Sequence, residues 1–598
     1  MRNMNNKKTD IWKLYEGGKE YKQSIGLFDE TDKNERFFIG DQWESKKIDG
    51  LPKPVFNILK RFVNYMAAAV NSNVIAVNFT PVSAPFNVVT ADEKSKYADN
   101  LKLYNDYVNG QTAEDDIKEN PVYKREQQAK KLTKMFASDW ERLQMDYIKL
   151  EGTKDTLLSG DWVLYAYWDC DAQTGQDNKG MLEVESIDNV NYYPGNPNEA
   201  DPQKQPYIIL KRRELVANVK AEAKANGVKE SDINNISADT DTEDVAGDAG
   251  KKELEETELS GKCSTLLYLW KDAKTKTIKA KKAAKNVIIR DEWDTKLKRY
   301  PVCVFSWDLR KNSCHGRSPL TGLIPNQVYI NKQAALYQLD ALNNVGGKVI
   351  YDKTRIEKWT NGVGTAIPCT GGTNDVITQV QGLPLPSNSL NFIQMCMDNT
   401  LQTLGMNDVT LGNVTPDNKS AYMAILEASS IPIECVKTRM RKMIEDFALI
   451  YIDILRANMT EPRWVEVNDD NGKPYYEVFG AEDFDSIVNV KIDVGASTLW
   501  SKIAAAQTAD NLLHAGLIEM TDYLEMLPDD YLPNKNKLLQ KYKEQQLQAQ
   551  KQKEMLEQLQ TQKAHQAQAQ QAPAQNETPV QEQQIPTQTP QEQSPQMP

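Results

Sequence analysis

The most informative stretch of the sequence is "RSPLTGLIPNQVYINKQAALYQLDALNNVGG", residues 317–347. Its opening Ser-Pro pair suits a helix N-cap and first turn, and Gly346-Gly347 is a typical helix end. Pro325 should kink or restart the helix, because proline lacks a backbone N–H. The apolar residues between these ends recur at helical spacing and form one stripe: Leu320, Leu323, Ile324, Val328, Ala335, Leu339 and Leu342. The pattern predicts an amphipathic helix with an apolar side that needs a partner.

A small β insertion and a second helix follow this first helix. Residues 348–387 are rich in Gly, Pro and Thr and contain short β-prone runs. A helix is predicted over about 389–405, with one apolar face made of Leu390, Ile393, Met397, Leu401 and Leu404. Two amphipathic helices joined by a β insertion form a hairpin too slender to fold alone. We therefore expect neighbouring copies of the chain to cover it, as a ring would.

A polar connector leads from this hairpin into a long helix. The connector is "NDVTLGNVTPDNKS", residues 407–420. Beyond it, apolar residues recur at spacings of three and four, namely Ile433, Val436, Met440, Met443, Phe447, Ile450 and Ile454. Pro432 lies inside this pattern, where it removes a backbone hydrogen bond and clashes with the preceding turn. The helix should bend there.

The N-terminal region carries an aromatic cluster. In "ERFFIGDQWES", residues 35–45, the aromatic side chains are Phe37, Phe38 and Trp43. Pro52 and Pro54 predict extended backbone, and a helical pattern follows with Phe56, Leu59, Val63, Met66 and Val70. The aromatics are expected to pack against the start of this helix, either as a lid or as plain core.

The rest of the chain alternates between helical and β patterns. Residues 93–160 are predicted to be mostly helical, and alternation around Tyr165 and Val184 predicts a hairpin. The acidic segment 231–250 buries too little to offset its ordering entropy, so we expect a mobile loop. The lysine run at 271–285 could contact phosphate, although a solvated hairpin face is the commoner arrangement. Residues 462–500 are β-prone, 501–545 helical, and the Gln/Pro-rich residues 546–598 are expected to be disordered.

Composition argues against several functional classes. The net charge of −12 does not suit a general nucleic-acid coat, which needs a large positive surface. Seven cysteines without a CxxC pair predict reduced thiols in a cytosolic setting. No apolar run approaches the roughly 18 residues of a membrane span, and the N-terminus lacks the apolar core of a signal peptide.

The sequence contains almost no catalytic motifs. The three histidines are His315, His514 and His565, and Cys314-His315 has no second pair to complete a zinc site. The chain has no P-loop, no G-x-S-x-G, no H-E-x-x-H and no carboxylate spacing typical of a catalytic pair. We therefore predict neither an enzyme nor a bound cofactor or metal.

As a whole, the arrangement resembles the portal proteins (head-to-tail connectors) of tailed bacteriophages. Three segments carry the resemblance: "FFIGDQW" with "LPKPVFNILKRFVNYMAA", then "HGRSPLTGLIPNQVYINKQAALYQ", and then residues 404–455. It covers about residues 15–545, and its order and spacing are more specific than any one motif. Where many family members have Ser-Gly before the long helix, this chain has Lys419-Ser420.

The resemblance implies an α+β, predominantly helical portal fold, assembled as a ring of usually twelve subunits around a channel for double-stranded DNA. Its parts would be a wing (1–317, with the mobile loop 231–250), stem helices (318–346 and 389–406), a clip (347–388), a tunnel loop (407–420), a kinked spanning helix with a β unit (421–500), a helical crown (501–545) and a disordered tail (546–598).

The tunnel loop is the expected DNA-channel site. Its candidate residues are Asn407, Asp408, Thr410, Asn413, Thr415, Asp417, Asn418 and Lys419. They are short and polar with two acids against one lysine, which suits DNA that slides without being held. An ordinary helix–helix loop is the alternative.

The resemblance also implies partners and a location. The partners are the terminase large subunit, the major capsid protein, head-tail adaptor or tail proteins, and DNA in transit. The location is the portal vertex of the virion capsid, after assembly in the host cytoplasm. Two other functions stay open: another virion structural protein, such as a minor capsid or adaptor protein, and a metal-dependent nuclease or hydrolase.

Overall fold

A computed structural model gives the fold in two compact units, residues 1–500 and 501–598. The structure describes residues 9–43, 52–72, 75–81, 91–108, 114–239, 261–345, 348–358, 367–372, 374, 376–380, 388–403, 419–468, 474–480, 484, 487–493, 508–518, 520–527, 535, 538–539 and 541–542. The described chain is mixed α and β, and all of its described strand pairs are antiparallel.

The centre of the first unit is a three-stranded sheet with the order β3-β2-β9. Its strands are β2 (Asp161–Asp169), β3 (Met181–Ile187) and β9 (Val302–Ser306). The predicted hairpin is confirmed as β2–β3, in which Val163 is opposite Ile187. The run "PVCVFSW" returns from another sheet to pair with the other edge of β2, so that Val163 also faces Val304.

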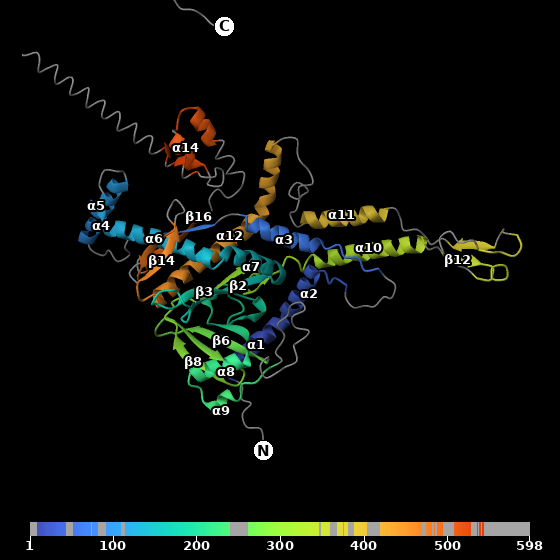
Figure 1. The fold of residues 1–598 in the computed structure, drawn as a ribbon, viewed down its shortest axis with the longest axis horizontal. Helices are drawn as coiled ribbons and strands as arrows, with labels where there is room; N and C mark the ends of the chain where they lie inside the picture. Colours follow the sequence, from blue (N-terminus) through green and yellow to red (C-terminus); the bar gives the residue numbers. More distant parts are fainter. Residues whose placement is uncertain are drawn as a thin grey trace, which may run out of the picture. The chain divides into compact units, whose positions relative to one another are not determined.

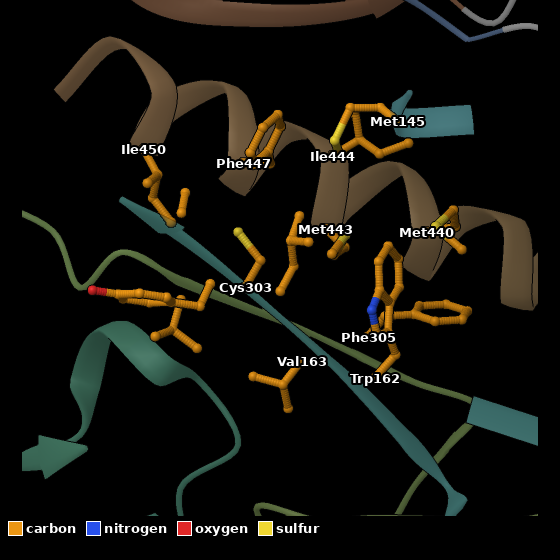
Figure 2. Packing of buried hydrophobic residues seen from close by; sticks show 14 of the residues in the cluster. Met145, Trp162, Val163, Cys303, Phe305, Met440, Met443, Ile444, Phe447 and Ile450 are labelled. Carbon is orange, nitrogen blue, oxygen red and sulfur yellow. The ribbon is translucent and has the colours of Figure 1, made fainter. Parts of the chain in front are cut away.

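One face of this sheet is covered by the long helix α12 (Lys419–Asn458). Figure 2 shows side chains of α12 pointing toward strands β2 and β9; the residues in this contact are Met440, Met443, Phe447, Trp162, Cys303 and Phe305. The predicted apolar pattern of the helix is therefore the pattern of its buried side. Burying each large apolar side chain stabilises the fold by about 1.5–3 kcal/mol.

Four further helices surround the same core: α2 (Leu27–Ile39), α3 (Ile58–Val70), α6 (Pro121–Arg142) and α7 (Met145–Ser159). The Asn120 side chain caps α6 by accepting the Val122 N–H, and Pro121 occupies the first turn. In the N-terminal aromatic cluster, Phe37 is buried and Phe38 is half-buried in the core beside α3. The predicted packing of these two aromatics at the start of the helix is thus confirmed.

A separate five-stranded sheet has the order β4-β5-β6-β7-β8. Its strands are β4 (Tyr192–Pro194), β5 (Tyr207–Leu215), β6 (Lys262–Lys271), β7 (Ile278–Ala283) and β8 (Ile288–Asp294). Helix α1 (Asp10–Ser24) packs on it through Trp12 and Tyr15, and α8 (Val216–Ala225) packs near its β5 and β8 strands.

The prediction of a mobile loop over 231–250 was wrong for its first part. Helix α9 (Glu230–Ile233) is followed by Ile236, which is buried in an apolar cluster with Val219 and Ile289. The Asp239 carboxylate accepts the Ser264 N–H at 2.8 Å. One buried isoleucine and one paired carboxylate hold this segment on the sheet. Residues 240–250 lie outside the described residues.

The described part of the body contains three further strand pairs. The predicted β unit after α12 contains the hairpin β14 (Arg463–Asn468) and β15 (Pro474–Phe479). The next strand, β16 (Ile487–Asp493), pairs with β1 (Ala76–Pro81), far away in the sequence. The remaining described elements are the helices α4 (Ala91–Val108), α5 (Glu114–Ile117), η1 (Asn189–Asn191) and η2 (Pro202–Lys204) and the paired short strands β10 (Asp308–Leu309) and β11 (Gly316–Arg317).

A helical arm leaves this body, as Figure 1 shows. It consists of α10 (Ile324–Val345), the strand pair β12 (Lys348–Tyr351) with β13 (Ile377–Val380), and α11 (Asn388–Thr403). The predicted order helix–β–helix is confirmed.

The predicted start of the first arm helix was wrong. Helix α10 begins at Ile324, at the proline, and not at Ser318. The Ser318 hydroxyl donates to the Leu157 carbonyl of α7 at 2.5 Å and accepts the Leu320 N–H. Residues 318–323 thus belong to a turn that is fixed to the body, and Pro325 sits where the helix starts.

In the second unit, residues 508–514 are helical and α14 (Met520–Met526) follows. Leu524 and Leu527 are buried together with half-buried Tyr523, Leu539 and Tyr542. The described part of 501–545 is thus helical, as predicted. The tail, 546–598, lies outside the described residues.

Candidate functional site: the helical arm and its attachment

The two arm helices pack side by side and run antiparallel. Asn326 near the start of α10 lies 3.4 Å from the Thr400 hydroxyl near the end of α11. Tyr329, one turn further, meets Phe392 in an edge-to-face contact with ring centroids 5.9 Å apart. Each helix therefore covers only one side of the other.

The arm leaves a long apolar surface exposed in a single chain. Near the body, Ile324, Ile330 and Ala335 of α10 are buried. Further along, burial is lost, and Leu342 is 64% exposed. The other large apolar residues exposed on the arm are Tyr329, Leu336, Tyr337, Ile350, Ile377, Phe392 and Met395. Exposed apolar side chains in this number are typical of a surface that another protein covers.

The base of the arm is fastened to the N-terminal region by buried amide side chains. Gln327 and Asn331, one turn apart on α10, are 1% and 2% exposed. The Ile58 N–H, at the start of α3, donates to Gln327 Oε1 at 3.1 Å, and the Phe56 N–H donates to Asn331 Oδ1 at 3.2 Å. Sequence analysis missed both residues, because only their position beside the apolar stripe distinguishes them from surface amides.

The long helix α12 is fixed to the body at its second half. The buried Asp453 carboxylate accepts the backbone N–H groups of Lys298 and Arg299 at 2.6 and 2.9 Å, just before β9. The Tyr451 hydroxyl donates to Asp139 of α6. Burial raises the pKa of Tyr451 well above its usual value, and the Asp139 charge raises it further.

The predicted tunnel-loop residues Asn407, Asp408, Thr410, Asn413, Thr415, Asp417 and Asn418 lie outside the described residues. The eighth, Lys419, is the first residue of α12. The loop therefore connects the end of α11, at Thr403, with the start of α12. That these residues line a DNA channel stays a prediction.

Pro432 lies inside α12, which is one helix of 40 residues. Figure 1 shows the ribbon of α12 in two segments that run in different directions. That the proline causes this bend stays a prediction.

The Cys314-His315 pair is part of the packed interior. His315 Nδ1 lies 3.1 Å from Asp161 Oδ2, and Asp161 Oδ1 accepts the Ser306 hydroxyl and the Gly316 N–H. Burial raises the pKa of the Cys314 thiol to about 12, so the thiol stays protonated and is a poor metal ligand. Among the described residues, no three His, Cys, Asp or Glu side chains are grouped to hold a metal ion.

Part of the lysine run lies on β7 (Ile278–Ala283), where three of its lysines pair with acidic side chains. Lys281 pairs with Asp291 at 2.7 Å, and Lys282 pairs with Glu214 and Glu222 at 2.9 and 2.8 Å. Lys279 pairs with Glu292. This agrees with a solvated hairpin face, on which the charges of these three lysines are paired with carboxylates.

A polar cavity of about 600 Å³ between α2, α7 and β5 was also missed. Its walls include Glu35, Asp155, Asp188 and Arg212. Burial raises the pKa of Glu35 to about 7, and the charges of Asp188 and Asp155 contribute. These carboxylates come from separate elements, so no local motif could have predicted them.

None of the described helices combines the length and the apolar character that a membrane crossing requires.

The comparisons with known proteins identify the family. A search of curated proteins finds no match. A sequence profile described as phage P22-like portal protein matches residues 211–594, which is more than half of the chain and includes the whole arm and α12. The chain therefore belongs to the phage P22-like portal protein family.

Proposed function

We propose that copies of this portal protein close into a ring of twelve subunits that forms the channel for double-stranded DNA at one capsid vertex. The single observation that carries the ring is the apolar surface of the arm, which one chain leaves exposed at Leu342, Leu336 and Phe392. In a ring, each arm meets the same two neighbours, so every exposed face is covered and no edge remains.

The parts of the chain then have distinct roles. The body would form the wing, the arm helices the stem, β12 and β13 the clip, and the helices of the second unit the crown. The clip would meet the terminase large subunit during packaging, and later the head-tail adaptor or tail proteins. The wing would meet the major capsid protein.

The tunnel loop, residues 407–420, would line the narrowest part of the channel. Its acids, Asp408 and Asp417, would keep DNA phosphates from binding during transit. A bend in α12 at Pro432 would let the loop move relative to the anchored second half of the helix, which Asp453 and Tyr451 hold.

The family is structural rather than enzymatic, and it belongs to virion assembly with capsid and packaging partners. No observation favours a nuclease or hydrolase: in the described part of the chain, the buried His315 and Cys314 are held as core side chains. Another virion structural protein is also less well supported, because the family match covers the arm.

Electron microscopy of the purified full chain tests the ring. We expect rings with a central hole, seen in end-on views. Leu342→Asp should reduce the ring fraction strongly, because it removes apolar contact area and introduces a charge at the contact. Tyr147→Asp is the control, since Tyr147 on α7 is comparably exposed at 63% but lies outside the arm. Wild-type protein that stays monomeric at every concentration would refute the proposed function.

A further inference from the structure

Three buried amide side chains form a directed chain of hydrogen bonds at the base of the arm. Gln327 Nε2 donates to Asn331 Oδ1 at 3.1 Å. Asn331 Nδ2 donates to Gln42 Oε1 at 2.7 Å, and Gln42 Nε2 donates to the Phe37 carbonyl at 2.9 Å. Each amide is thus both a donor and an acceptor, and such chains are strengthened by mutual polarisation. We call Gln42, Gln327 and Asn331 the amide chain.

The amide chain joins three separate segments of the molecule. It contacts the C-terminal end of α2 through Phe37, and the start of α3 through the Ile58 N–H. It also satisfies both backbone groups of Phe56, because Gln327 Nε2 donates to the Phe56 carbonyl at 2.6 Å. Loss of such partners leaves backbone groups with fewer hydrogen bonds and so destabilises the fold. The arm helix is therefore a hydrogen-bonding partner of Phe56 and Ile58.

The apolar contacts at the same place do not fix a direction. Ile324 and Ile330 are buried beside the amide chain, but apolar packing is non-directional and tolerates small rotations. Hydrogen bonds weaken when their donor–acceptor distance or angle changes. Because two of the amides lie one turn apart on α10, they resist both rotation and sliding of the helix.

In a ring, small differences in the angle between the arm and the body matter. The arm extends roughly 20 Å along α10 beyond Asn331, at 1.5 Å per residue. Only about 2° separates the rotation between neighbours in a ring of twelve from that in a ring of thirteen. An arm that could tilt by a few degrees would therefore fit more than one ring size.

We propose that Gln42, Gln327 and Asn331 are positioning residues that fix the angle of the arm on the body and thereby select the number of subunits at which the ring closes. This inference rests on the proposed function, because it needs a ring. It also gives a role to Gln42, a buried polar residue of the stretch 35–45 whose presence aromatic packing does not explain.

Native mass spectrometry of assembled rings tests the proposal. Gln327→Met keeps the length and volume of the side chain but removes the amide. We expect at least about a tenfold rise in the ratio of rings with other subunit numbers to rings of wild-type size, as loss of a 1.4 kcal/mol preference would give. Gln23→Met, at an exposed glutamine of α1 outside the arm, is the matched control and should keep the wild-type distribution.

Two further measurements keep the outcome decisive. If Gln327→Met does not fold, Gln42→Met decides, because it removes the far end of the amide chain and leaves the contacts of Gln327 to α3 in place. If the variants show a lower Tm but the wild-type subunit number, the amide chain only stabilises the fold and the proposal is wrong. Wild-type protein that forms no ring refutes the proposed function instead, so the two failures are distinct.

Discussion

The Tyr451 hydroxyl of α12 donates to the Asp139 carboxylate of α6 at 2.6 Å, inside the core that α12 shares with the central sheet. Asp139 also pairs with Arg142 at 3.0 Å. One hydroxyl therefore connects the long helix to a charged pair at the edge of the body.

Tyr451→Phe should destabilise the body measurably. The ring stays buried, but Asp139 loses a donor, and a hydrogen bond to a charged group is worth about 1.5–3 kcal/mol. The urea midpoint of the transition, followed by tryptophan fluorescence, should fall by a corresponding amount. Tyr147→Phe should leave it unchanged, since Tyr147 is exposed. Equal midpoints for Tyr451→Phe and wild type would show that the contact contributes nothing.

Two glycine substitutions should act in opposite directions. At Gly152 on α7, an added Cβ would lie 2.1 Å from the Trp162 ring, so Gly152→Ala must push the indole out of its place. Overpacking of this kind costs about 1–3 kcal/mol or more. At Gly17 on α1, a Cβ meets nothing within 4 Å. Gly17→Ala should stabilise the helix by about 0.5–1 kcal/mol. Thermal unfolding compares the pair, and a stable Gly152→Ala protein would contradict the packing around Trp162.

Glu35 should make stability depend on pH. Its pKa is raised to about 7 in the folded state, above its usual 4.5, chiefly by burial. The folded state then binds more protons than the unfolded state between those values, so this group reduces stability as pH rises through that window. Asp188, Asp155 and Asp32 repel it, and Lys211 and Arg212 also line the cavity.

Glu35→Gln removes this cost. Its Tm should exceed that of wild type at pH 8, and the difference should shrink below about pH 5, where the wild-type carboxyl is protonated. Glu30→Gln, at a carboxylate of the same helix outside this cavity, is the control. A Tm difference that does not change with pH would exclude this role of Glu35.

The tunnel loop should be needed for packaging and not for assembly. Deleting residues 410–417, or changing Asp408 and Asp417 to Lys, should leave rings intact in electron micrographs. Each added cation per subunit would create phosphate contacts around the whole ring, and each contact adds about one unit of salt dependence to DNA binding. The yield of DNA-filled heads should therefore fall for both variants. Normal yields would remove the loop from the mechanism.

Periodic apolar patterns predicted the helices and the helix–β–helix order of the arm well, because the apolar stripe of a helix is visible in residues that are close in the sequence. The stripe from Val436 to Ile454 is the buried face of α12. The start of α10 could not be predicted in the same way. Ser318 is a good N-cap by itself, but its hydroxyl is used by the Leu157 carbonyl, a tertiary contact that no neighbouring residue reveals.

The hydrogen bonds that attach the arm to the body could not be predicted from the sequence either. Gln42 and Asn331 are hydrogen-bonded in the structure but far apart along the chain. The residue type of an amide does not tell whether its side chain is buried or exposed. The predicted site residues 407–418 are local to one connector, so the sequence could locate them between two helices. In the proposed ring, the contacts of the connector would depend on other subunits, and the pattern of a single chain does not reveal them.

The pairing of β1 with β16 has a consequence for how the protein is made. Strand 76–81 leaves the ribosome early, but its partner, 487–493, is synthesised only near the end of the first unit. At about 5–20 residues per second, the early strand waits roughly 20–80 s with an unpaired edge. Nascent chains on one polysome carry the same edge at the same time. Pauses in translation between these strands should therefore favour aggregation or chaperone capture, and the supply of assembly-competent subunits would be set by elongation speed.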